Sequence, residues 1–207
     1  MLDPAIFVKE YQQLFQRTVS ADVVKNLQTL VSLLDMDVFM TDKRWCSYAL
    51  ATVLLECGPK FETALEVGTL SYFAKYASGT PLGRALGNTE VGDGVKFRGR
   101  GYVQITGRSN YAKFAHLLNV DLIEDPSYAM NVHIAYKILS MGMTQGLFTG
   151  FSLKHFINRA MCDYVNARRI INGTDKADVI AEYAIKMNDC WVAATADLLS
   201  GPSFVVT

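Results

Sequence analysis

Residues 49–66 read ALATVLLECGPKFETALE, an apolar run that ends at a glutamate and is followed, after one cysteine, by glycine and proline. Apolar residues recur every three or four positions from Trp45 onward, which is the spacing of a helix face. Glycine favours the left-handed conformation that closes a helix, and proline cannot continue the hydrogen-bond ladder. The sequence therefore predicts a helix from about Asp42 to Cys57, ended by Gly58 and Pro59.

Glu56 lies in the last turn of this predicted helix. The negative pole of the helix dipole and the apolar neighbours both favour a protonated carboxyl, as a general acid in glycosidic bond cleavage requires. The alternative is an ordinary helix-end glutamate that points into water. Glycoside hydrolysis needs a second carboxylate, and Glu62 and Glu66 follow in the next loop. Periodicity does not choose between them, although a solvated loop acid is the preferred interpretation of Glu62.

The pattern along the rest of the chain is mainly helical. Apolar spacing predicts two helices within residues 4–34, separated near residues 18–21. Frequent glycine and turn residues predict loops and short strands between residues 66 and 96. Further helices are expected at residues 110–118, 131–143, 153–158, 162–171 and 175 to about 199, followed by a surface-packed or frayed tail at 200–207.

The segment VKFRGRGYVQITG, residues 95–107, alternates as a half-buried strand does. Tyr102, Gln104 and Thr106 would then share one face, where the ring could stack on a sugar and the amide and hydroxyl could bind polar groups. The alternative is the exposed face of a hairpin. Arg108 and Lys113 with the RGRG run form either a small cationic patch or solvated charges. The glycine spacing does not fit a nucleotide-binding loop.

Composition is that of a globular protein of one domain. Half of the 207 residues are hydrophobic and the net charge is zero, so the chain has no footprint for strong binding to nucleic acid or a membrane. The start of the chain lacks the features of a secretory signal, and no apolar stretch is long enough to span a membrane. The four cysteines and three histidines are scattered, which predicts reduced, mostly buried thiols and no metal or other cofactor.

At GDGVKFRGRGYVQITGRSNY, residues 92–111, the chain resembles glycoside hydrolase family 19, the chitinase-like enzymes of the lysozyme superfamily, and particularly the phage endolysins among them. Further matching segments are ALATVLLECG, DLIEDPSYAM, GMTQGLFTG and DYVNARRIINGTDKADVIAEYA, so that the likeness spans about residues 45–184. The resemblance implies a mainly α (α+β, lysozyme-like) fold with two helical lobes around a cleft and a small β-hairpin. The expected organisation is one catalytic domain, residues 1–207, with a family-like core at 41–200 and unmatched N-terminal helices at 1–40.

The resemblance also implies site residues. It assigns Glu56 as the general acid and Glu66 as the base of an inverting hydrolysis of β-1,4 bonds between N-acetylated sugars. It further implies that substrate and the attacking water are bound by Tyr102, Gln104, Thr106, Asn110 and Asn172, with Arg168 or Arg169 in support. One departure is Leu55, which stands where the family usually has a histidine, so the orientation of the acid would depend on another group.

The expected function is that of an endolysin, a monomer that degrades bacterial peptidoglycan. Without a signal peptide, it would stay in the host bacterial cytoplasm until it is released to the cell wall. The expected partner is the peptidoglycan glycan strand, with no nucleic acid and no stable membrane association. The alternatives are a chitinase, a secreted antibacterial wall hydrolase, and a non-catalytic wall-binding module. A secreted chitinase would normally show a disulfide pattern.

Overall fold

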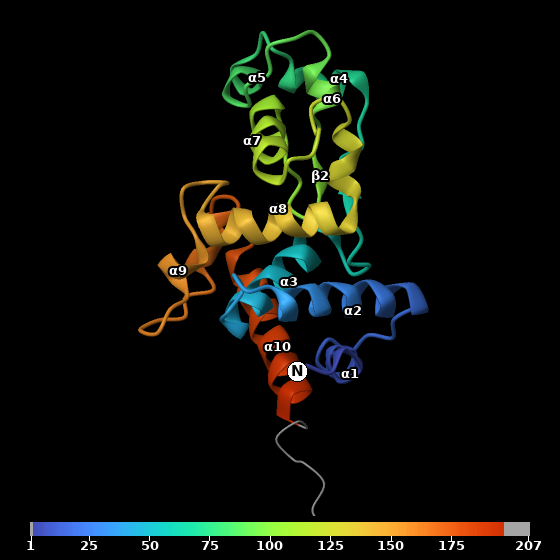
Figure 1. Ribbon diagram of the computed structural model, residues 1–207, viewed down its shortest axis with the longest axis vertical. Coiled ribbons are helices and arrows are strands. Elements are labelled where there is room, and N and C mark those ends of the chain that lie inside the picture. Colours follow the sequence, from blue (N-terminus) through green and yellow to red (C-terminus); the bar gives the residue numbers. More distant parts are fainter. Residues whose placement is uncertain (1, 197–207) are drawn as a thin grey trace, which may run out of the picture. The chain divides into compact units, whose positions relative to one another are not determined.

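Helices dominate the computed structural model, which describes residues 2–196 (Figure 1). A two-stranded antiparallel sheet pairs β1 (Ala64–Leu65) with β2 (Arg100–Gly101). The predicted fold class, mainly α with a small antiparallel β element, is confirmed. The predicted end of the last helix near residue 199 and the predicted tail lie outside the described residues.

The chain forms two compact units. Unit 1 comprises the described parts of residues 1–61 and 140–207, and unit 2 comprises residues 62–139. The chain leaves unit 1 and later returns to it, so the units are not successive domains. The first two helices pack against α10 (Ala177–Ala196) and α3 (Lys43–Cys57), which makes the N-terminal region part of unit 1.

Unit 1 is built around α3. Residues 46–54 of this helix are all buried, because the helix is apolar on nearly every side. The ring of Trp191 in α10 packs edge-on against Phe7 with 5.3 Å between ring centroids. The other helical segments of unit 1 are α1 (Pro4–Leu14), α2 (Ala21–Met36), the end of α8 (Val132–Gln145), α9 (Leu153–Phe156) and the 3₁₀ segment η3 (Asn166–Ile170).

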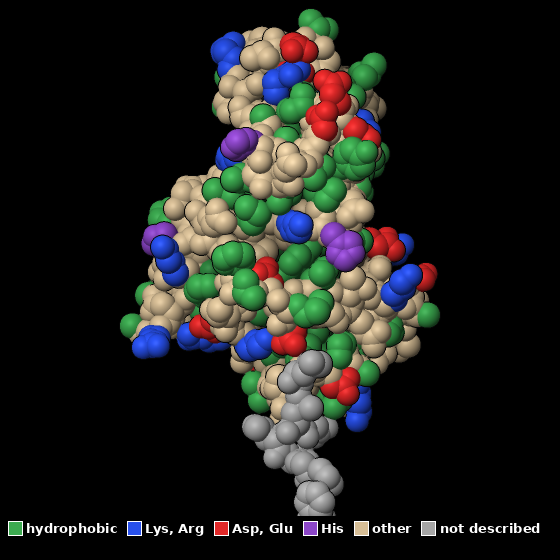
Figure 2. Space-filling view, in the orientation of Figure 1, with side chains coloured by type: hydrophobic (Ala, Val, Ile, Leu, Met, Phe, Trp, Pro, Cys, Tyr) green, Lys and Arg blue, Asp and Glu red, His purple; other side chains and the backbone are tan. Residues whose placement is uncertain are grey.

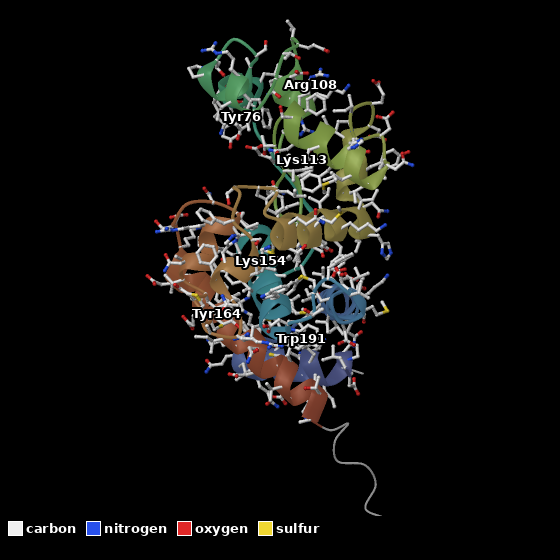
Figure 3. All side chains as sticks on the ribbon, turned by 60° about the vertical axis from the view of Figure 1, so that its left-hand side comes forward. Tyr76, Arg108, Lys113, Lys154, Tyr164 and Trp191 are labelled. Carbon is white, nitrogen blue, oxygen red and sulfur yellow. The ribbon has the colours of Figure 1, made fainter. Side chains whose placement is uncertain are left out.

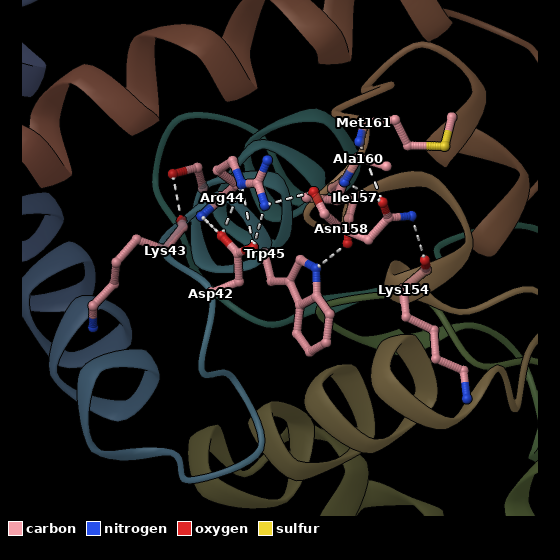
Figure 4. Close-up of polar contacts among 10 residues, drawn as sticks. Asp42, Lys43, Arg44, Trp45, Lys154, Ile157, Asn158, Ala160 and Met161 are labelled. Carbon is pink, nitrogen blue, oxygen red and sulfur yellow. Dashed lines mark hydrogen bonds and ion pairs between the residues drawn. The ribbon is translucent and has the colours of Figure 1, made fainter.

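The start of α3 is fixed by polar contacts (Figure 4). The Asp42 carboxylate caps the helix by accepting from the Arg44 N–H at 2.9 Å, and the Arg44 guanidinium pairs with the same carboxylate. Arg44 Nη2 also donates to the carbonyl of Asn158 at 2.9 Å, and Trp45 Nε1 donates to the carbonyl of Ile157 at 2.8 Å. These bonds tie the loop after α9 to the helix that carries Glu56 at its other end.

Unit 2 consists of short elements around an aromatic core. Phe73, Phe97, Tyr111 and Phe114 are buried there. Its segments are β1, α4 (Leu70–Phe73), η1 (Ala74–Tyr76), α5 (Pro81–Ala85), α6 (Asp93–Lys96), β2, α7 (Arg108–Leu118), η2 (Pro126–Met130) and the first part of α8. The loops and short strands predicted for residues 66–96 are therefore wrong in part, since short helices occupy much of this range.

The predicted strand at residues 95–107 is wrong except at β2, which covers only Arg100–Gly101. Arg100 and Ile105 face each other as an antiparallel bridge, and the residues between them form a tight turn. Gly101 (φ 84°) and Gln104 (φ 51°) adopt left-handed backbone conformations at the two ends of that turn. A turn has no alternating faces, so the two-residue spacing of Tyr102, Gln104 and Thr106 does not place them in one row.

Most of the predicted helices are present in the structure, and one is not. The predicted helices at 4–34, 42–57, 110–118 and 131–143 are confirmed to within a few residues. The predicted helix at 162–171 is wrong, because only the 3₁₀ segment η3 forms there. Within residues 2–196, no helix is both long and apolar enough to cross a membrane.

Two basic residues of the predicted cationic patch, Arg100 and Arg108, are engaged by other side chains of unit 2. Arg108 makes a two-pronged ion pair with the buried Asp93, at 2.7 and 2.8 Å, and Arg100 donates to the Tyr111 hydroxyl at 2.9 Å. Arg108 is labelled in Figure 3 on unit 2. On the face drawn in Figure 2, acidic and basic side chains are interspersed, as expected for a chain of zero net charge.

Candidate active site

Glu56 is the penultimate residue of α3, and Gly58 closes that helix with φ 78°. The Glu56 carboxylate pairs with Arg168 of η3, with 2.6 Å between Oε1 and Nη1. The Arg168 side chain is only 4% exposed, whereas that of Glu56 is 23% exposed. Arg168 Nε donates to the carbonyl of Asp175 at 3.0 Å, which fixes the guanidinium from its other side.

This ion pair changes the expectation for Glu56. The sequence leaves open a carboxyl that simply points into water, but the Glu56 carboxylate is held by the Arg168 guanidinium instead. It also decides between the two candidate arginines, because Arg169 is exposed and Arg168 is buried against the acid. Arg168 is thus the group that orients Glu56 where the resemblance would have a histidine at Leu55.

Glu66 directly follows β1, and its N–H donates to the carbonyl of Gly99 at 2.9 Å. Three donors reach its carboxylate. The hydroxyls of Tyr72 and Tyr76 donate to Oε1 at 2.8 and 2.9 Å, and the Gly99 N–H donates to Oε2 at 2.9 Å. Partial burial alone would raise the pKa of Glu66, but these hydrogen bonds and the charge of Lys75 outweigh it and lower the pKa below its ordinary value.

Gly99 lies between Glu66 and Gln104. A Cβ atom at Gly99 would lie 2.8 Å from Gln104 Oε1 and 3.2 Å from Glu66 Oε2, so glycine permits the close approach of both side chains. Gln104 Nε2 donates to the carbonyls of Ala64 and Gly101, at 2.6 and 2.9 Å. The amide nitrogen is engaged by the backbone, so the part of Gln104 that it can offer to a ligand is its acceptor oxygen.

The other predicted binding residues of unit 2 differ in what they can offer. Tyr102 is 2% exposed, so its ring is not presented for stacking on a sugar, while its role in binding substrate stays a prediction. Tyr102 lies within the tight turn between Arg100 and Ile105. The Thr106 hydroxyl donates to the carbonyl of Gln104, and the Asn110 amide donates to the carbonyl of Thr106, at 3.0 and 2.9 Å.

The remaining predicted residues are exposed. Asn172 follows η3 in unit 1, and its side-chain oxygen accepts from the N–H of Gly173 at 2.8 Å. Glu62 is exposed, as the preferred interpretation of a solvated loop acid requires. The roles of Gln104, Thr106, Asn110 and Asn172 in binding substrate stay predictions.

The structure thus gathers the predicted residues into two groups. Glu56, Arg168 and Asn172 belong to unit 1, while Glu66, Gln104, Thr106 and Asn110 belong to unit 2. Two tyrosines of the second group, Tyr72 and Tyr76, were missed by sequence reasoning. Their spacing of four positions, shortly after Glu66, was the available signal, because residues four apart share a helix face.

Within residues 2–196, no three His, Cys, Asp or Glu side chains are arranged to hold a metal ion. The four cysteines are free thiols. Cys46 and Cys190 are buried, as expected for most of the thiols, whereas Cys162 is exposed.

Comparison with known proteins adds to this geometry. A segment of 51 residues is 47% identical to a glycosyl hydrolase family 19 domain-containing protein of Haemophilus influenzae. Chitinase C from Streptomyces griseus has a similar fold, with a TM-score of 0.59 over 94% of this chain and 76% of that one. The chain resembles the family 19 glycoside hydrolases in sequence and in fold.

The sequence match covers only part of each chain. The match to the Haemophilus protein covers 25% of this chain and 25% of that relative. The two chitinase C structures are 17% and 16% identical to the chain, so they establish the fold alone. The second, a mutant of chitinase C, has a TM-score of 0.52 over 93% of this chain and 92% of that one. No protein-family model matches the chain.

Proposed function

We propose that the protein is a glycoside hydrolase that cleaves β-1,4 bonds between N-acetylated sugars by single displacement, with inversion at the reacting carbon. The observation that carries the proposal is Glu66. A half-buried carboxylate that three hydrogen bonds hold in one orientation suits a general base, because a positioned carboxylate can accept a proton from water. The resemblance to family 19 in sequence and in fold supports the same reaction class.

Glu56 is the proposed general acid. It donates a proton to the oxygen of the leaving sugar, so that negative charge develops on its carboxylate during the step. Arg168 lies 2.6 Å from that carboxylate, and a fixed guanidinium there stabilises the developing charge. In this proposal the ion pair is the state after proton donation, and Glu56 takes up a proton again before the next turnover.

The proposed substrate is the glycan strand of bacterial peptidoglycan, and we propose that the protein acts as an endolysin that reaches the wall from the host cytoplasm. The likeness of residues 92–111 to phage endolysins supports this, as do four free cysteines where a secreted chitinase would normally have disulfides. Chitin is the second candidate substrate, because both solved structures with the similar fold are named chitinases.

One experiment separates these substrates. Purified protein is incubated with peptidoglycan sacculi and, separately, with soluble chitin oligomers, and reducing ends and products are analysed. Release of reducing sugar from sacculi alone supports the lysin. Cleavage of chitin alone would overturn it in favour of the chitinase, and no cleavage of either would leave a non-catalytic wall-binding module.

Three matched substitutions test the catalytic assignment. Glu56→Gln should abolish turnover, and Glu66→Gln should lower it by about 10²-fold or more, because each removes a proton-transfer group and keeps the side-chain shape. Glu62→Gln is the control, since Glu62 is an exposed glutamate four positions before Glu66. Full activity in Glu56→Gln refutes its role as the acid. If Glu62→Gln is the damaging loop substitution and Glu66→Gln is not, the base is misassigned.

A further inference from the structure

Two tyrosine hydroxyls and one backbone N–H surround the Glu66 carboxylate asymmetrically. Both hydroxyls, from Tyr72 and Tyr76, donate to Oε1, and the Gly99 N–H donates to Oε2. A carboxylate has about four sites for accepting hydrogen bonds, two on each oxygen. Counting donors within residues 2–196, both sites on Oε1 are occupied and one on Oε2 is open.

The two tyrosine rings are themselves held in place. Phe73, which is buried, packs edge-on against Tyr72 with 5.2 Å between ring centroids and lies 6.4 Å from the Tyr76 ring. Lys75 Nζ lies over both tyrosine rings, 3.6 Å from the centroid of Tyr72 and 4.7 Å from that of Tyr76. Cation–π attraction therefore fixes both rings from the solvent side, and Tyr76 is labelled in Figure 3.

We propose that Tyr72 and Tyr76 are positioning residues for Glu66: their hydroxyls occupy Oε1 and leave the open site of Oε2 for the water that attacks the sugar. The inference rests on the proposed function. In the step, the water oxygen bonds to the reacting carbon, one water proton moves to Oε2, and the leaving oxygen takes its proton from Glu56. Without the two hydroxyls, the carboxylate would rotate among several orientations, only some of which present a free lone pair to the water.

The same contacts should affect how the reaction rate depends on pH. The side chains that interact with the Glu66 charge are Tyr72, Lys75 and Tyr76 on α4 and η1, and Tyr111 on α7. The tyrosine hydroxyls lower the pKa of Glu66, so replacing them with hydrogen raises it. Because the base must be ionised, the acid limb of the pH–rate profile moves to higher pH in such variants.

The test uses Tyr72→Phe, Tyr76→Phe and the double variant, which keep the rings and remove only the hydroxyls. Tyr128→Phe is the matched control, because Tyr128 is an exposed tyrosine of the same unit, 48% exposed. The profile of kcat/KM against pH is measured on whichever substrate the wild type cleaves, sacculi or chitin oligomers. The double variant should lose about 10-fold or more in kcat, with KM within about twofold of wild type, and its acid limb should move up by about one pH unit.

A second readout does not depend on turnover. The ¹³C signal of the Glu66 carboxyl, assigned by its absence in Glu66→Gln, is titrated in wild type and in the Phe variants. An upward shift of its midpoint in the variants supports the proposal. An unchanged midpoint, or an unchanged acid limb and kcat in the double variant while Glu66→Gln is inactive, overturns the positioning role and leaves the proposed function standing. Wild-type activity in Glu66→Gln would instead overturn the base itself.

Discussion

Removing either partner of the Glu56–Arg168 ion pair should cost different amounts of stability. The two side chains are unequally buried, at 23% exposed for Glu56 and 4% for Arg168. In Glu56→Met the guanidinium loses its counter-ion in a site where water hardly reaches it. Loss of one partner of a buried pair costs about 3–5 kcal/mol, and we take the lower end, about 3 kcal/mol, because this pair is partly exposed.

Arg168→Met should be the milder change. It leaves a carboxylate that water can reach, together with the carbonyl of Asp175, whose hydrogen bond to Arg168 Nε contributes about 1 kcal/mol. The expected loss is about 1–2 kcal/mol in the free energy of unfolding. The double variant should lose less than the sum of the two single losses, because it leaves no unpaired charge.

Urea unfolding followed by tryptophan fluorescence measures these losses. Trp45 and Trp191 are the two tryptophans of the sequence, and both lie in unit 1 with the ion pair. A 3 kcal/mol loss corresponds to a fall in Tm of roughly 6–12 °C for a chain of this size. Equal losses for the two single variants, or additive losses in the double variant, would refute the reasoning that burial of the unpaired charge sets the cost.

Three further substitutions test other parts of the molecule. Asp93→Asn should lower the free energy of unfolding by about 2 kcal/mol at pH 7, because Arg108 holds the pKa of the buried Asp93 carboxyl at about 2 against an ordinary 3.8. That stability is present above about pH 4 and is lost as the pH falls towards 2. Urea unfolding followed by circular dichroism at pH 7 and at pH 2 measures the difference. Gly99→Ala should lower kcat by about 10-fold or more with little change in Tm, because the added Cβ displaces the terminal oxygens of the Gln104 and Glu66 side chains. An unchanged kcat would mean that neither side chain acts in the reaction. Gly101→Ala should lower the free energy of unfolding by about 1–3 kcal/mol, because φ is 84° and the Cβ would meet the carbonyl of Ala129 at 2.9 Å; a stability equal to wild type would show that this turn can relax.

Leu55 stands where the resembled family usually has a histidine, directly before the acid. The sequence shows that the usual histidine before the acid is absent, and it leaves open which group takes over its orientation. The structure supplies Arg168, whose guanidinium contacts the Glu56 carboxylate directly. Leu55 itself is half-buried beside Glu56.

The sequence alone determined the features that depend on neighbouring residues. The helix that carries Glu56 was predictable because apolar spacing and the Gly58–Pro59 break both act within a few positions. The mainly helical fold class followed for the same reason. The strand prediction failed because alternation over a few residues does not reveal the left-handed conformations of Gly101 and Gln104, which turn the chain back within four residues.

Tertiary structure decided the chemical surroundings of the two acids. Arg168 lies 112 positions from Glu56, and Gly99 lies 33 positions from Glu66, so no local pattern links either pair. The same is true of Tyr102, whose ring was placed on a binding face by its sequence spacing and lies buried instead. Sequence could name the carboxylates because their types and helix positions are local properties. Which groups form hydrogen bonds and ion pairs with these carboxylates depends on how distant segments pack.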